Sequence, residues 1–125
     1  NFLGDWVPPK PSGGKTAPFG DPESAKFINN CHYLYQLQLA ARIARLLGKE
    51  ADAALYQGRA VALGQALHRL YYRPETATYA SGEQPYLAFP LMVGLTPPEL
   101  REAVARRLDE TIRVTNRGHI DAGMH

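Results

Sequence analysis

The stretch Tyr86-Leu-Ala-Phe-Pro-Leu-Met-Val-Gly-Leu95 contains no charged residue and would present apolar side chains on every face of a helix. Such a distribution is typical of a helix that is buried on all sides. Pro90 lies inside the stretch and precedes Gly94, so it would kink the helix or limit its length. A short helix buried in this way needs other helices around it, and the stretch therefore predicts an all-α fold.

The residues before this stretch predict a long helical hairpin. Asp21-Pro-Glu23 combines an N-cap, a proline in the first turn and an acid at the helix N-terminus. We expect a first helix over 21–47 and, because the connection at 48–50 is so short, an antiparallel second helix over 51–72. Apolar side chains recur at steps of three and four in the first helix, at Phe27, Ile28, Cys31, Leu34, Tyr35, Leu39, Ile43 and Leu46.

The residues after the stretch predict an amphipathic helix. Thr96-Pro-Pro-Glu99 has the pattern of a capping box with proline at the first helical position. Oppositely charged residues follow at i,i+4 spacing, as in Glu102–Arg106 and Asp109–Arg113. A single narrow apolar stripe runs along the other face, through Leu100, Val104, Leu108 and Ile112. This helix is therefore expected on the outside of the fold.

Together these elements predict antiparallel helical hairpins that form part of a toroid with an inner and an outer layer of helices. Four helices would supply only part of such a toroid. The expected layout along the chain is a substrate-side loop over 1–20, a first helical hairpin over 21–72, a turn over 73–84, a second helical hairpin over 85–116 and a loop over 117–125. Because the chain starts at Asn1 and stops at His125 without a recognisable terminus, we interpret it as an internal fragment.

Composition excludes several classes of function. The chain has 125 residues, is 45% hydrophobic and 21% charged, and carries a net charge of +2 from well-interleaved charges. This is too weakly basic for a nucleic-acid partner, and no run approaches the roughly 18 apolar residues of a membrane span. The sequence has neither a P-loop nor a dinucleotide fingerprint, so no cofactor is predicted. A single cysteine, Cys31, excludes an internal disulfide and leaves the compartment open.

The residues able to do chemistry are concentrated in loops. Gly4-Asp5-Trp6 places a carboxylate beside the only tryptophan, in a proline- and glycine-rich segment that is either a linker or a substrate-binding loop. Asp5, Glu83 and Asp121 all have aromatic or histidine neighbours, a setting that suits hydrogen bonds to sugar hydroxyls. Nothing in their spacing says which would be an acid or a base.

The histidines and the cysteine give weaker indications. His32 and His68 lie inside helices and are interpreted as packing or surface residues. The spacing His119-x-Asp121-x-x-x-His125 could in principle hold a metal, but no fourth ligand is visible and no metal site is predicted. Cys31 has no activating neighbours in its helix, so nucleophilic chemistry there is not expected.

Three motifs, taken in order, resemble one family. They are Gly4-Asp5-Trp6, the segment Thr78-Tyr-Ala-Ser-Gly-Glu-Gln84 leading into Tyr86-Leu-Ala-Phe-Pro-Leu91, and Gly118-His-Ile-Asp-Ala-Gly123. Their order and spacing are similar to the catalytic domain of bacterial α-L-rhamnosidases (glycoside hydrolase family 78) over nearly the whole chain. The resemblance implies an (α/α)6 barrel, a six-hairpin toroid. It also implies an inverting hydrolase that removes terminal α-L-rhamnose from glycosides or polysaccharides.

The resemblance also implies which residues meet the sugar. The family's catalytic acid and base lie in motifs outside this chain, so the chain would supply substrate-binding wall and no catalytic residue, and would be inactive alone. Trp6 would stack on rhamnose, Asp5 would accept hydrogen bonds from hydroxyls, and Gln84, His119 and His125 would lie at the same cavity. Many family members have smaller neutral residues where this chain has Glu83, and the role of Glu83 stays open.

Two alternatives remain at this point: another α/α-toroid enzyme acting on carbohydrates, and a non-enzymatic helical interaction domain. The expected partners are a rhamnose-containing carbohydrate and the remainder of the parent barrel. Apolar faces left uncovered in this chain, above all around Phe89 and Met92, would also allow a homo-oligomer.

Overall fold

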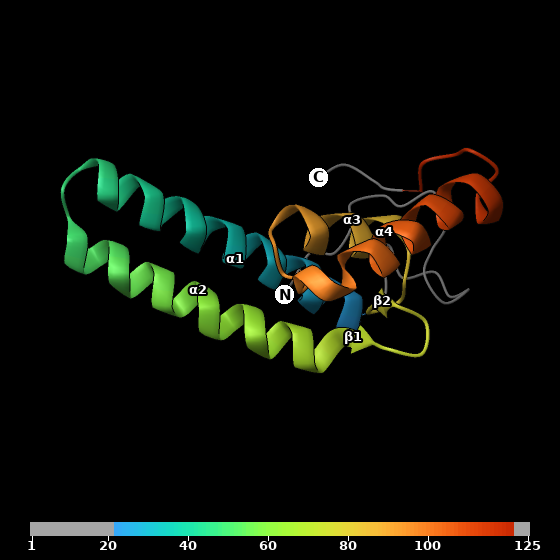
Figure 1. Cartoon of the computed structure of the whole chain (residues 1–125), viewed down its shortest axis with the longest axis horizontal. Helices are drawn as coiled ribbons and strands as arrows, with labels where there is room; N and C mark the ends of the chain where they lie inside the picture. The colour runs from blue at the N-terminus through green and yellow to red at the C-terminus, as the bar shows by residue number, and fades with distance from the viewer. Residues whose placement is uncertain (1–21, 122–125) are drawn as a thin grey trace.

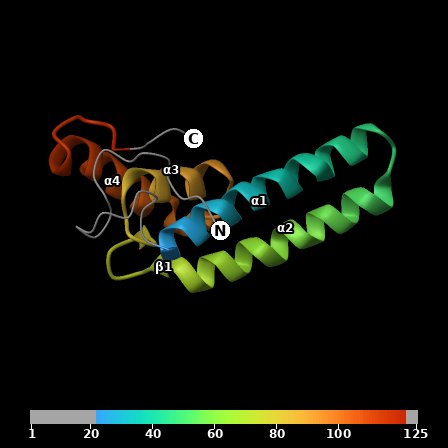
Figure 2. The ribbon, with the colours of Figure 1, turned by 180° about the vertical axis from the view of Figure 1, so that it is seen from behind.

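The structure is a computed structural model, and it describes residues 22–121. Two long helices, α1 (Pro22–Leu46) and α2 (Glu50–Tyr71), form an antiparallel hairpin. The shorter helix α3 (Gln84–Met92) packs against α1 at one end of that hairpin and α4 (Arg101–Glu110) packs against α3, while the connection between α1 and α2 projects away from them (Figure 1). The view from behind shows the same arrangement (Figure 2). The predicted all-α fold of antiparallel helical hairpins is therefore confirmed.

Alanine side chains are buried between α1 and α2 in the half of the hairpin that is nearer to their connection. The side chains that α2 buries are Ala53, Ala60 and Leu67, and beyond Leu37 the helix α1 buries only alanines, Ala41 and Ala44. Alanine at a contact lets two helix backbones approach closely. The connection turns sharply at Gly48, whose φ of +68° lies in the left-handed region that favours glycine.

The segment between the hairpins contains a strand pair that the sequence did not predict. Strands β1 (Tyr72–Arg73) and β2 (Thr78–Tyr79) pair antiparallel, with Tyr72 opposite Tyr79. Each strand has two residues, which is too short to produce a recognisable alternation of apolar and polar side chains. The pairing carries Tyr79 into the core, where it is completely buried.

An aromatic cluster forms the centre of the core. The ring of Phe27 on α1 lies 4.9 Å from that of Tyr71, 5.5 Å from that of Tyr79 and 6.4 Å from that of Tyr86. These rings come from both helical hairpins and from the strand pair. The core is therefore located where α3 and the strand pair meet the first half of α1.

The helix α3 is only partly buried, which corrects the expectation of burial on all sides. Tyr86, Leu87 and Pro90 are buried, but Ala88 is exposed and Met92 is 61% exposed. The uncovered side belongs to the region around Phe89 and Met92 that the sequence predicted to lack neighbours. The helix ends shortly after Pro90, and Gly94 follows with a φ of +69°.

The final helix has the predicted stripe but a different beginning. Val104 is buried and Leu108 packs against the core, while Glu102–Arg106 and Asp109–Arg113 form exposed ion pairs of 2.6 Å. The capping box is not formed, because a 3-10 turn at Pro98–Leu100 precedes α4 and no side chain caps either element. A π turn at Thr111–Thr115 follows α4. Within the described part of the chain, no helix is both long and apolar enough to cross a membrane.

Candidate functional site

The start of α3 is joined to the loop that follows the π turn. Gln84, the first residue of α3, is 3% exposed. Its Nε2 donates a hydrogen bond of 2.9 Å to the backbone carbonyl of His119, and its Oε1 accepts one of 3.2 Å from the backbone N–H of Asp121. One buried amide therefore holds two backbone groups of a loop that is distant in sequence.

Asp121 completes the connection from the loop side. Its Oδ1 accepts a hydrogen bond of 3.3 Å from the backbone N–H of Gln84, and its Oδ2 accepts one of 2.6 Å from Nδ2 of Asn116. The N–H groups in the first turn of a helix have no partner within the helix, and a negative charge there is favourable. Glu83, at the N-cap position, makes no cap hydrogen bond through its side chain. Asp121 therefore caps α3 from a distant loop.

The approach to α3 is also tied to the start of α1. Ser24, which is buried in the first turn of α1, donates a hydrogen bond of 2.8 Å to the hydroxyl of Ser81. The Ser81 hydroxyl in turn donates to the carboxylate of Glu83. A hollow of about 460 Å³, lined in part by Ser24, Arg73 and Ser81, opens beside this contact. The beginnings of α1 and α3 thus lie at the same end of the fold, together with the loop after the π turn.

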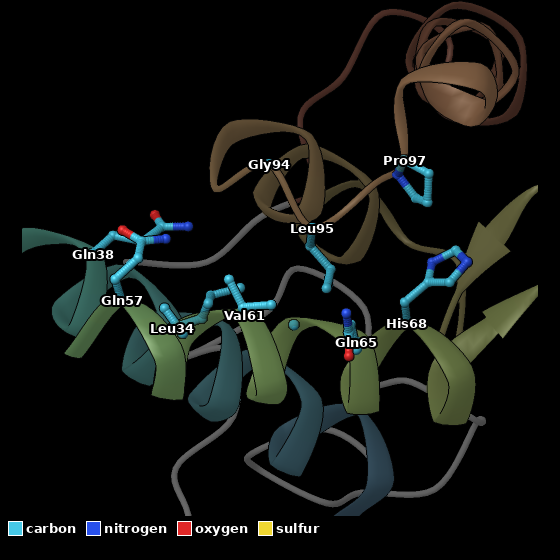
Figure 3. A pocket seen from close by; sticks show the side chains of 11 residues that line it. Leu34, Gln38, Gln57, Val61, Gln65, His68, Gly94, Leu95 and Pro97 are labelled. Atoms are coloured by element: carbon cyan, nitrogen blue, oxygen red, sulfur yellow. The ribbon is translucent and has the colours of Figure 1, made fainter. Parts of the chain in front are cut away.

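A second hollow lies at the opposite end of α3. This groove of about 400 Å³ is bounded by α1, α2 and the segment after α3, and Figure 3 shows Leu95 and Pro97 facing Val61 and His68 across it. Gln38, Gln57 and Gln65 add amide groups to its lining. None of the residues lining it in the described part of the chain is an acid, so the groove has no carboxylate of its own for acid/base chemistry.

Comparison with known proteins then decides the family. The family described as the bacterial α-L-rhamnosidase six-hairpin glycosidase domain matches residues 1–125. The chain belongs to this family. The predicted rhamnosidase resemblance is thereby confirmed, and the two helical hairpins described above are part of an α/α toroid.

Solved structures of α-L-rhamnosidases have the same fold. The structure from Dictyoglumus thermophilum superposes with a TM-score of 0.82 at 26% identity, over 97% of this chain and 13% of that one. The structure from Streptomyces avermitilis, complexed with L-rhamnose, gives 0.77 at 27% identity, over 96% and 10%. The structure from Aspergillus terreus gives 0.78 at 23% identity, over 97% and 14%, and supports the fold alone. This chain thus spans a small part of these structures, and the comparison with curated proteins gave no match.

The structure brings together two of the five residues that the sequence predicted at the rhamnosidase sugar site. Gln84 and His119 are in contact, but through the backbone carbonyl of His119, whose imidazole is exposed. Asp5, Trp6 and His125 lie outside the described residues. The sequence did not predict that Asn116 and Asp121 would hold the Gln84 contact. No local pattern indicates it, because the partners are 37 residues apart.

The other polar candidates have structural contacts. His32 lies against Phe89, with ring centroids 4.5 Å apart, and His68 places Nδ1 2.8 Å from the hydroxyl of Tyr79. Burial raises the pKa of the Cys31 thiol to about 12, so this side chain is a neutral thiol at neutral pH and not a nucleophile. Among residues 22–121, no three His, Cys, Asp or Glu side chains gather as metal ligands.

Proposed function

We propose that this chain is part of a glycoside hydrolase that removes terminal α-L-rhamnose from glycosides or polysaccharides by inverting acid/base hydrolysis. In this proposal the chain supplies part of the sugar-binding wall, and the catalytic acid and base lie elsewhere in the protein. Membership of the rhamnosidase family supports the reaction class. The main structural support is the meeting of Gln84 with His119 and of Ser24 with Ser81, because these contacts gather several loops at one end of the helices.

The carboxylates at this end fit a supporting role. Inverting hydrolysis needs two carboxyl groups roughly 6.5–9.5 Å apart, with a water molecule between one of them and the sugar. Asp121 uses both oxygens to hold Gln84 and Asn116, and Glu83 accepts a hydrogen bond from Ser81. Both carboxylates are therefore used in hydrogen bonds within the protein. This supports a part of the sugar-binding wall that contains neither the catalytic acid nor the catalytic base.

The wall residues have chemistry that suits a deoxy sugar. Rhamnose has an apolar face that includes its methyl group, and an indole ring such as that of Trp6 stacks well on such a face. Asp5 would accept hydrogen bonds from adjacent hydroxyls. His119 has an exposed imidazole that can donate or accept, and His125 follows it in the sequence.

The test uses the full-length protein and an aryl α-L-rhamnoside. We expect hydrolysis in which the first product seen by NMR is the β-anomer, as inversion requires. W6A and H119A should each lower kcat/KM, by about tenfold to a hundredfold, which is the effect of losing one or two good contacts to the transition state. Release of the α-anomer would contradict inversion. Cleavage of other aryl glycosides but not of the rhamnoside would favour another α/α-toroid enzyme, and no cleavage of any would favour a non-enzymatic domain.

A further inference from the structure

We propose that Gln84, Asp121 and Asn116 form a clamp that positions the loop over residues 116–121 at the sugar site. In this proposal Gln84 acts through His119 and does not itself touch the sugar. The assignment rests on the proposed function, since it takes the exposed His119 as the residue facing the ligand. It makes Gln84 a positioning residue and gives Asp121, whose role the sequence left open, a defined task.

Reciprocal hydrogen bonds between Gln84 and Asp121 form the centre of the clamp. The backbone N–H of each residue donates to a side-chain oxygen of the other, over 3.3 Å and 3.2 Å. A contact of this kind fixes both the distance and the relative orientation of the two backbones. Because Gln84 is 3% exposed and its Nε2 already binds the carbonyl of His119, a ligand has almost no access to its amide.

Apart from the clamp, the loop is held by backbone hydrogen bonds at its start and not by apolar packing. Ile120 is its apolar side chain, and it is 64% exposed, so it does not anchor the loop in the core. Arg117 has a φ of +52°, and such a left-handed conformation costs about 1 kcal/mol or more for a residue with a side chain. Within the loop, the N–H of His119 donates to the carbonyl of Asn116 over 2.9 Å. The N–H of Gly118 donates to the carbonyl of Ile112 over 2.7 Å, so local hydrogen bonds support the turn at Arg117. The contacts with α3 are the ones that hold the end of the loop, at His119 and Asp121.

Charge strengthens the part of the clamp that Asp121 and Asn116 form. The Asp121 carboxylate lies at the N-terminus of α3, where the aligned peptide dipoles favour a negative group, and it accepts the 2.6 Å hydrogen bond from Asn116. Pro85, directly after Gln84, has no N–H, so the Gln84 N–H is the donor that α3 offers at this point. The amide of Asn116 and the carboxylate of Asp121 thus form a matched donor and acceptor.

The first test separates positioning from direct contact, using Q84M and H119A in the full-length protein. Methionine keeps the size of glutamine and removes both side-chain hydrogen bonds. We expect Q84M to speed hydrogen exchange in the 117–121 loop about tenfold, the effect of losing two hydrogen bonds, and to raise KM for an aryl α-L-rhamnoside. H119A should raise KM and leave exchange at Asp121 unchanged. A Q84M protein with raised KM and an unchanged loop would mean that Gln84 touches the sugar, and the proposal would fail.

The second test exchanges the donor Asn116 and the acceptor Asp121. N116D alone sets two carboxylates against each other, so loop exchange should rise about tenfold or more. Adding D121N restores one amide facing one carboxylate, and the double variant should recover most of the loop protection. If hydrogen exchange in the loop is no slower in N116D/D121N than in N116D, the proposed clamp is wrong.

A matched control and the choice of readout complete the design. Gln65, an exposed glutamine on α2 in the groove at the other end of α3, provides Q65M, which should leave loop exchange unchanged. If Q65M changed loop exchange as much as Q84M does, the effect would not be specific and the clamp would be excluded. Hydrogen exchange needs no activity, so a protein that cleaves no rhamnoside refutes the proposed function while the two exchange tests still decide whether the clamp exists.

Discussion

The two ends of the α1–α2 hairpin both carry apolar side chains at helical spacing, but their surroundings are opposite. At the packed end, formed by residues 24–37 of α1 and 60–71 of α2, Phe27 and Cys31 are completely buried. At the tip, formed by residues 41–55, Ala41, Ala44 and Ala53 are buried, whereas Leu46 is 87% exposed. Figure 1 shows α3, with α4 packed on it, at the packed end only. An apolar pattern thus identifies a helix face that can be buried, and neighbours from other hairpins decide whether it is buried.

The difference has a consequence for the candidate site. The loops that meet at Gln84 and Ser81 lie at the packed end, where α1 is held by the aromatic cluster around Phe27. Rigid support of this kind keeps the side chains of a binding wall in one geometry. The tip takes no part in these contacts, so it can change without moving the proposed sugar-binding wall.

The largest predicted effect is the loss of the aromatic centre at the packed end. Phe27→Ala removes the ring that contacts Tyr71, Tyr79 and Tyr86, and we expect it to lower the free energy of unfolding by about 3–5 kcal/mol. Leu46→Ala, at the tip of the same helix, should change it by less than about 0.5 kcal/mol. Urea unfolding followed by circular dichroism measures both. Similar losses in the two variants would show that the tip is also packed in solution.

The sequence predicted the features that have a local signal and missed those that depend on distant parts of the chain. The helices α1 and α2, and the stripe of α4 through Val104, were predicted because steps of three and four residues are a local signal. The strand pair that buries Tyr79 was missed, because strands of two residues have no periodicity to detect. The link from Gln84 to Asp121 was missed because it depends on the path of α4 and its π turn. The family resemblance predicts Gln84 near the sugar cavity but does not indicate which groups its amide binds.

A medium-sized effect is expected at alkaline pH, and it again comes from the packed end. Burial raises the pKa of Cys31 to about 12 and that of Tyr79 to about 12, so the folded protein retains protons that the unfolded chain releases earlier. Their contribution to stability is complete below about pH 9 and is lost progressively as the pH rises toward 12. For Cys31 alone the loss by pH 10 is about 1.4 kcal/mol.

The variant Cys31→Ala isolates this contribution. It removes the titrating thiol, so the fall in unfolding free energy between pH 8 and pH 10 should be smaller than in the wild type by about 1.4 kcal/mol. The comparison uses the slope with pH, which is independent of the cost of the substitution at neutral pH. Equal slopes in the two proteins would mean that the thiol is not held in its protonated form by burial.

The smallest effect on stability, and the sharpest test of the tip, is expected from Leu46→Glu. Leu46 is accompanied at the tip by Ile43, Leu47 and Leu55, which are all exposed, and such a cluster favours contact with another surface. The isolated chain should self-associate with rising concentration in sedimentation velocity, and Leu46→Glu should reduce this while changing the unfolding free energy by less than about 0.5 kcal/mol.

In the full-length protein, a loss of about 1–3 kcal/mol of unfolding free energy in the same variant would mean that other hairpins of the domain cover the tip, because a charge would then be buried without a partner. A wild-type chain that stays monomeric at every concentration would contradict the expected homo-oligomer and leave the rest of the barrel as the only partner for this surface.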